Sequence, residues 1–391
     1  MTLVSRNLWV LAASQALMLS GMSLVVTTAP LVGLSLTEGE SLATLPVAAM
    51  HIATLLTTLP AAFLMGRFGR KAGFLTGVAL GVTGAGVATL GVLERSMVLF
   101  SLGTAMVGIH HGFANHFRFA AADGVPAAQR SVAVSRVLAG GILAAVVGPS
   151  LAHYTWQWMD EPFAASYAAL LAVYLVSVVV LLALRPAPTI SPGPTDVRPA
   201  RPLGAVASQP RFLAAVTCAT FGYATMTLVM TATPLAMKGH GHSFADTASV
   251  IQWHILGMFA PSLITGRLIR RFGIISVLWA GVALESAAVA LNLVGAEVVY
   301  FRVSLIALGV GWNFLFVGGT TLLMETYRPS ERARAQGLND GIVFTTVALA
   351  TLMAGVLHPL VGWRGVNLSV LPLLLIVAVS IAVARRRLAP S

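Results

Sequence analysis

Residues 22–30 read MSLVVTTAP, and residues 226–234 read MTLVMTATP. The two stretches align without a gap at a constant offset of 204 residues, and each begins with methionine and ends with proline. At the same offset, Arg67-Phe68-Gly69 aligns with Arg271-Phe272-Gly273. We therefore predict that the chain consists of two halves derived from one repeated unit.

Uncharged apolar segments recur along the whole chain. Hydrophobic residues make up 57% of the 391 residues and charged residues only 9%, whereas a soluble domain is about a quarter charged. A helix of about twenty residues crosses the ~30 Å hydrocarbon layer of a membrane. The sequence thus predicts an all-α, polytopic membrane protein with twelve transmembrane helices in two six-helix pseudo-symmetric bundles, at residues 8–32, 43–65, 72–93, 97–118, 132–153, 163–184, 211–236, 246–266, 274–295, 299–323, 337–357 and 366–384.

A proline-rich stretch separates the two sets of six helices. Residues 185–210 read RPAPTISPGPTDVRPARPLGAVASQP and contain no long apolar run, which is typical of an extended linker. The predicted organisation is an N-terminal six-helix bundle at 1–184, a cytoplasmic linker at 185–210 and a C-terminal six-helix bundle at 211–391.

Basic residues are unevenly distributed among the predicted loops. With both termini in the cytoplasm, the outer side holds only four of the 24 Lys and Arg residues, namely Arg95, Lys238, Arg302 and Arg364. The net charge of +11 is then a consequence of topology, and its scatter over short loops argues against a nucleic-acid partner. We expect a monomer in the lipid bilayer of a bacterial cytoplasmic (inner) membrane.

The sequence also bears on the class of function. It contains no recognisable phosphate-binding loop, nucleophile elbow or catalytic pair of carboxylates, so we expect a secondary transporter without a prosthetic group, and neither an enzyme nor an ATP-driven pump. A membrane-embedded metal sensor with a transporter fold is the alternative outside transport. Nothing in the sequence resembles a signalling domain, which disfavours the sensor.

Related basic loops follow the second predicted helix of each half. They read GRFGRK at residues 66–71 and GRLIRRFG at residues 266–273. Two parallel six-helix repeats with basic loops at these places resemble the Major Facilitator Superfamily along nearly the whole chain. The loop signature of that superfamily carries an acidic residue, and this chain has Gly66 or Arg270 in its place.

The resemblance implies a role in gating or topology for charged residues in and near these loops. The candidates are Arg67, Arg70, Lys71, Arg118, Asp123 and Arg271. Plain anchoring of the positive side of the membrane is the alternative. We also expect interior charge pairs between Arg118 and Asp123, and between Glu325 and Arg328.

Two pairs of soft donors follow each other in the seventh and eighth predicted helices. Met226 and Met230 are four residues apart, as are His254 and Met258, so each pair lies on one helical face. Their expected depths below the outer ends of the helices interleave, at about 15, 9, 12 and 18 Å in the order named. Thioether and imidazole groups together suit Cu(I), so these four residues form a candidate metal site. Helix packing by methionine is the alternative.

The combination Met-x₃-Met in the seventh helix and His-x₃-Met in the eighth resembles the CcoA-type copper importers, a bacterial branch of the superfamily. The resemblance implies import of copper, as Cu(I), by alternating access, in support of cytochrome c oxidase assembly. Copper is then the transported substrate, with a copper-delivering or copper-accepting chaperone as a partner. Members of the branch that carry organic solutes such as riboflavin define the alternative function.

Further donors lie near the candidate metal site. Met22 and His51 occupy the repeat positions of Met226 and His254 in the first half. The residues predicted as additional metal contacts are Met22, His51, Cys218, Met237, His240 and His242. Ordinary packing, or a flexible surface position, is the alternative for each of them.

Polar side chains within the predicted helices are costly to bury and therefore point to function or to a partner. Metal contact, proton relay and packing remain open for the three histidines of the fourth helix, His110, His111 and His116. In the ninth helix, Glu285 is a candidate for proton coupling. Cavity lining and bonding to a neighbouring helix are the alternatives for Asn313, Asn339 and Asp340.

Overall fold

The computed structural model describes residues 3–123, 125, 133, 136–137, 139–185 and 200–386. Within these ranges all regular structure is helical, which confirms the predicted fold class. Nine helices in the described part are long and apolar enough to cross a membrane, or ten when the bent pair α11 and α12 is counted as one span. The chain is therefore a multi-pass membrane protein.

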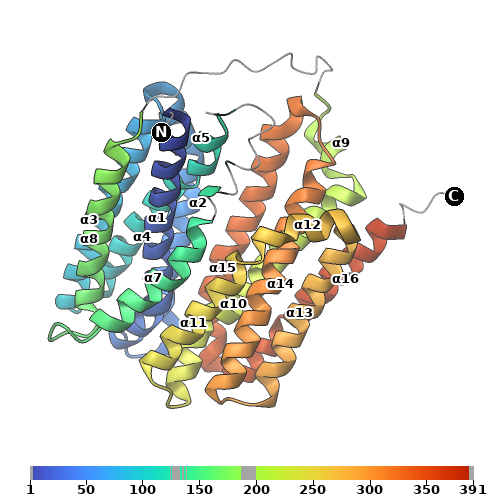
Figure 1. Ribbon diagram of the computed structural model, residues 1–391. Coiled ribbons are helices and arrows are strands. Elements are labelled where there is room, and N and C mark those ends of the chain that lie inside the picture. The colour runs from blue at the N-terminus through green and yellow to red at the C-terminus, as the bar shows by residue number, and fades with distance from the viewer. Residues whose placement is uncertain are drawn as a thin grey trace. The chain divides into compact units, whose positions relative to one another are not determined.

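The first of two compact units comprises Met1–Ser191 and Pro234–Leu256. Within it, α1 packs against α7 and α8, α2 packs against α4, and α3 packs against α4 and α8 (Figure 1). The helices that lie wholly in this unit are α1 (Leu3–Ser35), η1 (Glu40–Leu42), α2 (Leu45–Phe68), α3 (Arg70–Leu93), α4 (Met97–Ala114), α5 (Phe117–Asp123), α7 (Gly140–Thr155) and α8 (Ala164–Leu182).

The second unit comprises Pro192–Thr233 and Gly257–Ser391. In it α13 packs against α12, α14 and α16. Two helices, α10 (Pro210–Gly239) and α11 (Phe244–Phe259), are divided between the units, so that residues 234–256 of the predicted C-terminal bundle are grouped with the first unit. The remaining helices are α9 (Leu203–Ala207), α12 (Ser262–Phe272), α13 (Ile274–Val294), α14 (Val298–Met324), η3 (Pro329–Glu331), α15 (Arg332–Ser369) and α16 (Leu371–Arg386).

Helix packing within each unit follows the sequence repeat. The contact of α3 with α4 in the first unit corresponds to that of α13 with α14 in the second, and the contact of α3 with α8 corresponds to that of α13 with α16. The contact of α2 with α4 corresponds to that of α12 with α14. Equivalent helices of the two halves thus meet the same neighbours.

The aligned Arg-Phe-Gly loops have the same local structure. Gly69 and Gly273 adopt φ angles of 85° and 81°, in the left-handed region where a side chain is unfavourable. In both loops the guanidinium carbon of the arginine, Arg67 or Arg271, lies 5.3 Å from the ring centroid of the phenylalanine that follows it. The repeat is therefore one of backbone conformation and side-chain contact as well as of sequence.

Two predicted helices differ in shape from simple straight spans. The predicted helix at 246–266 is bent by 43° between α11 and α12, next to Pro261. Proline has no amide hydrogen for the helical ladder, which accounts for a bend at this place. The predicted helix at 337–357 extends to Ser369, with a break at Gly362, where φ is 66°.

Candidate functional site

Five aromatic side chains of the second unit form an aromatic cluster, defined as Tyr223, Phe259, Trp312, Phe316 and Phe344. The rings of Trp312 and Phe316 stack one helical turn apart on α14, with centroids 5.1 Å apart and an interplanar angle of 10°. Tyr223 of α10 meets the Trp312 ring edge-on at 5.2 Å, and Phe259 lies 6.3 Å from it. Such a cluster offers large flat surfaces that suit a planar aromatic ligand.

The face of α10 that carries Tyr223 continues along the helix. Thr227 and Met230 follow Tyr223 by four and seven residues, so the three side chains lie on one face. The Thr227 hydroxyl is buried and has no hydrogen-bond partner among the described residues. This face therefore combines an aromatic ring, a hydrogen-bonding group and a polarisable thioether.

Two further buried polar atoms near the aromatic cluster lack hydrogen-bond partners within the described ranges. They are the indole Nε1 of Trp312 and the side-chain oxygen Oδ1 of Asn339. Asn339 precedes Val343 by one turn on α15, and Val343 belongs to a hydrophobic group against which Tyr223 and Phe316 pack. A buried donor and a buried acceptor that are left unsatisfied are ready to bind a polar ligand.

Asn313 and Asp340 have other roles in the structure. The Asn313 amide nitrogen donates to the Met258 carbonyl and to the Ser262 hydroxyl, both at 2.7 Å, and its oxygen accepts from Thr265 at 2.7 Å. Asn313 therefore bonds the neighbouring helices at the bend between α11 and α12. Asp340 accepts a hydrogen bond from the amide of the adjacent Asn339 at 3.0 Å.

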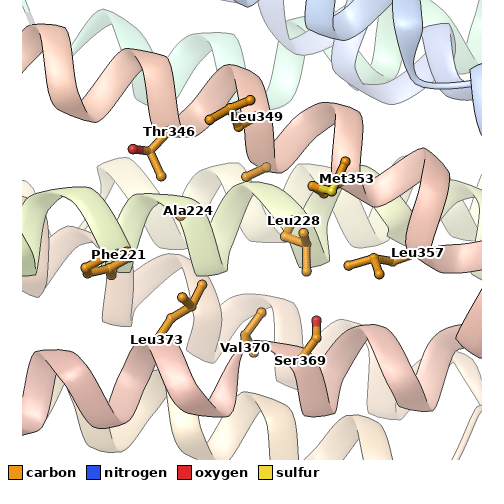
Figure 2. Close-up of a pocket in the computed structure, with 11 residues that line it drawn as sticks. Phe221, Ala224, Leu228, Thr346, Leu349, Met353, Leu357, Ser369, Val370 and Leu373 are labelled. Carbon is orange, nitrogen blue, oxygen red and sulfur yellow. The ribbon is translucent and has the colours of Figure 1, made fainter.

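A cavity of about 230 Å³ lies between α10, α15 and α16. Figure 2 shows its lining, in which Phe221, Leu228 and Met353 are typical. Its two hydroxyl groups, on Thr346 and Ser369, donate at 2.8 Å to carbonyls of their own helices. The lining therefore offers an apolar surface and few free polar groups, which does not suit a flavin.

The four predicted metal ligands are all buried, but they do not belong to one unit. Met226, Met230 and Met258 lie in the second unit, and His254 lies in the first. The site is thus not a feature of either unit alone. Its assembly from the four side chains stays a prediction.

The additional predicted metal contacts lie in different surroundings. Cys218 is buried in a hydrophobic group of the second unit that includes Leu278 and Leu315. His240 is exposed, and its Nδ1 lies 2.8 Å from the Ala236 carbonyl. Of the others, His51 and Met237 are buried, and Met22 and His242 are partly buried.

The described contacts of His110 and His116, in and just after the predicted fourth helix, involve different neighbours. His110 is buried and packs edge-on against Tyr174, with centroids 4.9 Å apart. His116 lies between α4 and α5, and its Nε2 is 3.1 Å from the Thr58 carbonyl. No group of three or more His, Cys, Asp or Glu side chains in the part of the chain that the structure describes could hold a metal ion.

The charged residues assigned to gating have local contacts. The Lys71 ammonium donates to the Leu182 carbonyl at 2.7 Å, which links the start of α3 to the end of α8. The Arg118 guanidinium lies 4.9 Å from the Phe119 ring centroid. The side chain of Asp123, and with it the predicted Arg118–Asp123 pair, lies outside the described side chains.

The expectation of an interior charge pair at Glu325 is wrong in one respect. This carboxylate lies 3.2 Å from Arg211, and the two side chains are 42% and 41% exposed. The pair therefore lies at the surface, because α14 ends at Met324 and leaves Glu325 at its C-terminal cap.

An ion pair that the sequence analysis missed connects the end of the linker to the segment between α14 and α15. Arg201 donates to both carboxylate oxygens of Glu331, from Nε at 2.9 Å and from Nη2 at 2.7 Å. The Arg201 backbone N–H also donates to this carboxylate at 2.7 Å. These hydrogen bonds hold the pKa of Glu331 well below its usual range and raise the pKa of Arg201. Because the two residues are distant in sequence, no local motif predicts the pair.

Comparison with known proteins extends these observations. The riboflavin transporter RfnT of Brucella anthropi is 40% identical over 380 residues, which cover 97% of this chain and 95% of that protein. The uncharacterized MFS-type transporter YddS of Bacillus subtilis is 28% identical and covers 96% of this chain and 90% of its own length.

Two solved structures share the fold at 14% identity. The human organic anion transporter MFSD10 superposes with a TM-score of 0.71 over 97% of this chain and 100% of that chain. A bacterial metal transporter superposes with a TM-score of 0.67 over 98% of this chain and 99% of that chain. The model of the Major Facilitator Superfamily matches residues 11–291 and 249–391. The chain belongs to the Major Facilitator Superfamily.

Proposed function

We propose that this protein is a secondary transporter for riboflavin or a closely related flavin. The observation that carries the proposal is the 40% identity to a riboflavin transporter over 97% of the chain. For copper, the substrate first predicted from the methionine and histidine motifs, the likeness to a bacterial metal transporter at 14% identity is one of fold alone. The proposal therefore replaces copper with the organic solute as the main substrate.

The chemistry of the aromatic cluster supports this substrate. An isoalloxazine ring is planar and aromatic, and offset stacking or edge contacts with Tyr223 and Trp312 would bind it. Its carbonyl oxygens accept hydrogen bonds and its imide nitrogen donates one. The Trp312 indole N–H and the Asn339 Oδ1 provide the complementary donor and acceptor.

Met230 fits the same substrate. It lies two turns from Tyr223 on one face of α10, and thioether sulfur packs favourably at the edge of an aromatic ring. The methionines that suggested copper thus have a second chemical role, as part of an apolar surface for a flavin.

Copper import remains the second candidate function, because Met-x₃-Met and His-x₃-Met occur in consecutive membrane helices and all four donors are buried. Under this alternative, Met226, Met230, His254 and Met258 exchange ligands with arriving Cu(I). The orientation proposed for either substrate has both termini on the cytoplasmic side, as the distribution of basic residues predicts.

The proposal is tested by uptake assays in cells that lack both uptake routes. Radiolabelled riboflavin and radiolabelled copper are measured side by side. We expect expression of the protein to restore riboflavin accumulation and to leave copper accumulation at the background of cells without the protein. Accumulation of copper without riboflavin would reverse the assignment in favour of the second candidate.

A further inference from the structure

A carboxyl group is completely buried in the second unit. Glu285 is the twelfth of the 21 residues of α13, about 15 Å from either end of the helix. Its side chain is 0% exposed, and neither carboxyl oxygen has a hydrogen-bond partner among the described residues. A charge in such a place costs far more than a neutral group, so the geometry favours the protonated acid.

The surroundings of Glu285 offer no compensating cation in the part of the chain that the structure describes. The helices packed against α13 include α12, α14, α15 and α16. Among the described residues, Cys218 of α10 is a titratable side chain near Glu285. On α14, Gly311 faces Glu285, since a Cβ built on Gly311 would lie 2.7 Å from the Glu285 Cγ.

A neutral acid without hydrogen bonds adds little to helix packing. Methionine, leucine or glutamine would fill the same space at a lower desolvation cost. It differs from them in one property, which is that it can release its proton. Acidic residues within membrane helices are accordingly associated with proton pathways.

The neighbours of Glu285 also connect it with the proposed substrate site. Gly311, which faces the carboxyl group, is followed on α14 by Trp312 of the aromatic cluster. Cys218 precedes Tyr223 of the same cluster by five residues on α10. A ligand that binds between Trp312 and Tyr223 therefore contacts α14 and α10, the two helices that carry these neighbours of Glu285.

We propose that Glu285 is a proton-binding site that loses and regains its proton during transport, so that substrate uptake is coupled to a proton gradient. The inference rests on the proposed function for the identity of the substrate. Movement of α10 or α14 away from α13 admits water to the carboxyl group and allows release of the proton. Closure around the substrate requires the group to be protonated again.

Transport assays in proteoliposomes separate the two parts of this mechanism. Wild-type protein is expected to exchange riboflavin across the membrane and to accumulate it several-fold when the outside is more acidic. E285Q keeps the shape of the neutral acid, so we expect normal exchange and accumulation reduced to the level without a gradient. E285D, which retains a titratable acid, is expected to restore part of the accumulation. The matched control is E325Q, at an exposed carboxylate, which is expected to behave as wild type.

Carbodiimide labelling tests the protonation of the acid independently of transport. The carboxyl proton moves to one nitrogen of dicyclohexylcarbodiimide while the carboxyl oxygen bonds to the central carbon, and an oxygen-to-nitrogen shift gives a stable N-acylurea without a leaving group. We expect the peptide that contains Glu285 to gain the mass of one reagent molecule at neutral pH, and E285Q to gain none there.

The outcomes are distinguishable. If wild-type protein exchanges no riboflavin, the proposed function fails, and coupling to this substrate fails with it. If exchange is intact and E285Q still accumulates riboflavin in response to the gradient as wild type does, the proton site is refuted while the proposed function stands. Absence of labelling at Glu285 from pH 5 to pH 9 would overturn the protonated state.

Discussion

Asn313 donates a hydrogen bond of 2.7 Å to the backbone carbonyl of Met258, across the bend between α11 and α12. The same side chain bonds Ser262 and Thr265 on the other side of the bend. Pro261 interrupts the helical ladder at this place, and Asn313 supplies hydrogen bonds there. Asn313 of the tenth predicted helix thus stabilises the bend in the eighth.

Replacement of Asn313 by leucine removes all three hydrogen bonds and leaves buried polar groups without partners. We expect N313L to lower the free energy of unfolding by about 1–3 kcal/mol. Thermal unfolding of the purified protein in detergent measures the effect. T265V removes only one of the three bonds and is expected to cost less. Equal melting temperatures for N313L and wild type would contradict this role of the side chain.

The aromatic cluster is expected to determine riboflavin affinity. W312A removes a ring that stacks on Phe316 and meets Tyr223, so we expect the KM for riboflavin uptake to rise about five-fold, the equivalent of about 1 kcal/mol of ring contact. W312F keeps a ring and is expected to have a smaller effect. W158A, at an exposed tryptophan of the first unit, is the control and should leave the KM unchanged. An unchanged KM in W312A would place the substrate elsewhere.

Paired replacement of Met226 and Met230 by leucine separates the two candidate substrates. Leucine preserves most of the volume and apolar character of methionine but has no sulfur. We therefore expect riboflavin uptake by the double variant to stay within about two-fold of wild type. If copper is the substrate, the same variant should lose copper accumulation. Loss of riboflavin uptake in a folded double variant would show that the sulfur atoms themselves are needed.

The Arg201–Glu331 pair predicts a pH dependence of stability. The pKa of Glu331 is held below its usual range, so its contribution is complete above the unfolded-state value of about 4.3 and is lost as the pH falls through the folded-state value. We expect E331Q to melt at a lower temperature than wild type, by a similar amount from pH 7 down to about pH 5. Below about pH 4, the difference between the two melting temperatures should narrow.

E325Q serves as the control for that experiment, because Glu325 also pairs with an arginine, Arg211, but both side chains of that pair are exposed. Exposed pairs contribute little, so its melting temperature should lie close to that of wild type. A gap between E331Q and wild type that stays constant down to pH 3 would mean that the carboxylate charge is not the source of stability.

The architecture was predictable because hydrocarbon imposes a simple rule on sequence. A helix must be about twenty residues long and nearly free of charge, and the repeat at Met22 and Met226 then places six helices in each half. The rule does not predict bends or breaks within a helix. At the bend beside Pro261, hydrogen bonds come from Asn313 of another helix, and this contact between helices cannot be read from the length and polarity of a segment.

The candidate site was harder to predict, since spacing along a helix identifies which residues share a face and does not identify their neighbours. Met226 and Met230 stood out by chemistry, and copper followed from them. The aromatic cluster brings together residues from four helices, and Tyr223 and Trp312 have no distinctive pattern of their own. For the same reason the Arg201–Glu331 pair emerged only from the structure.

The contact between Gly311 and Glu285 has an evolutionary consequence. A methyl group on residue 311 would lie 2.7 Å from the Glu285 Cγ, and it would lie 3.0 Å from both the Glu285 backbone nitrogen and the Gly281 carbonyl oxygen. A larger residue at position 311 therefore requires α13 and α14 to move apart, whatever side chain stands at position 285. In homologues whose helices pack as closely as these, we expect a glycine at this position whether or not the acid is kept.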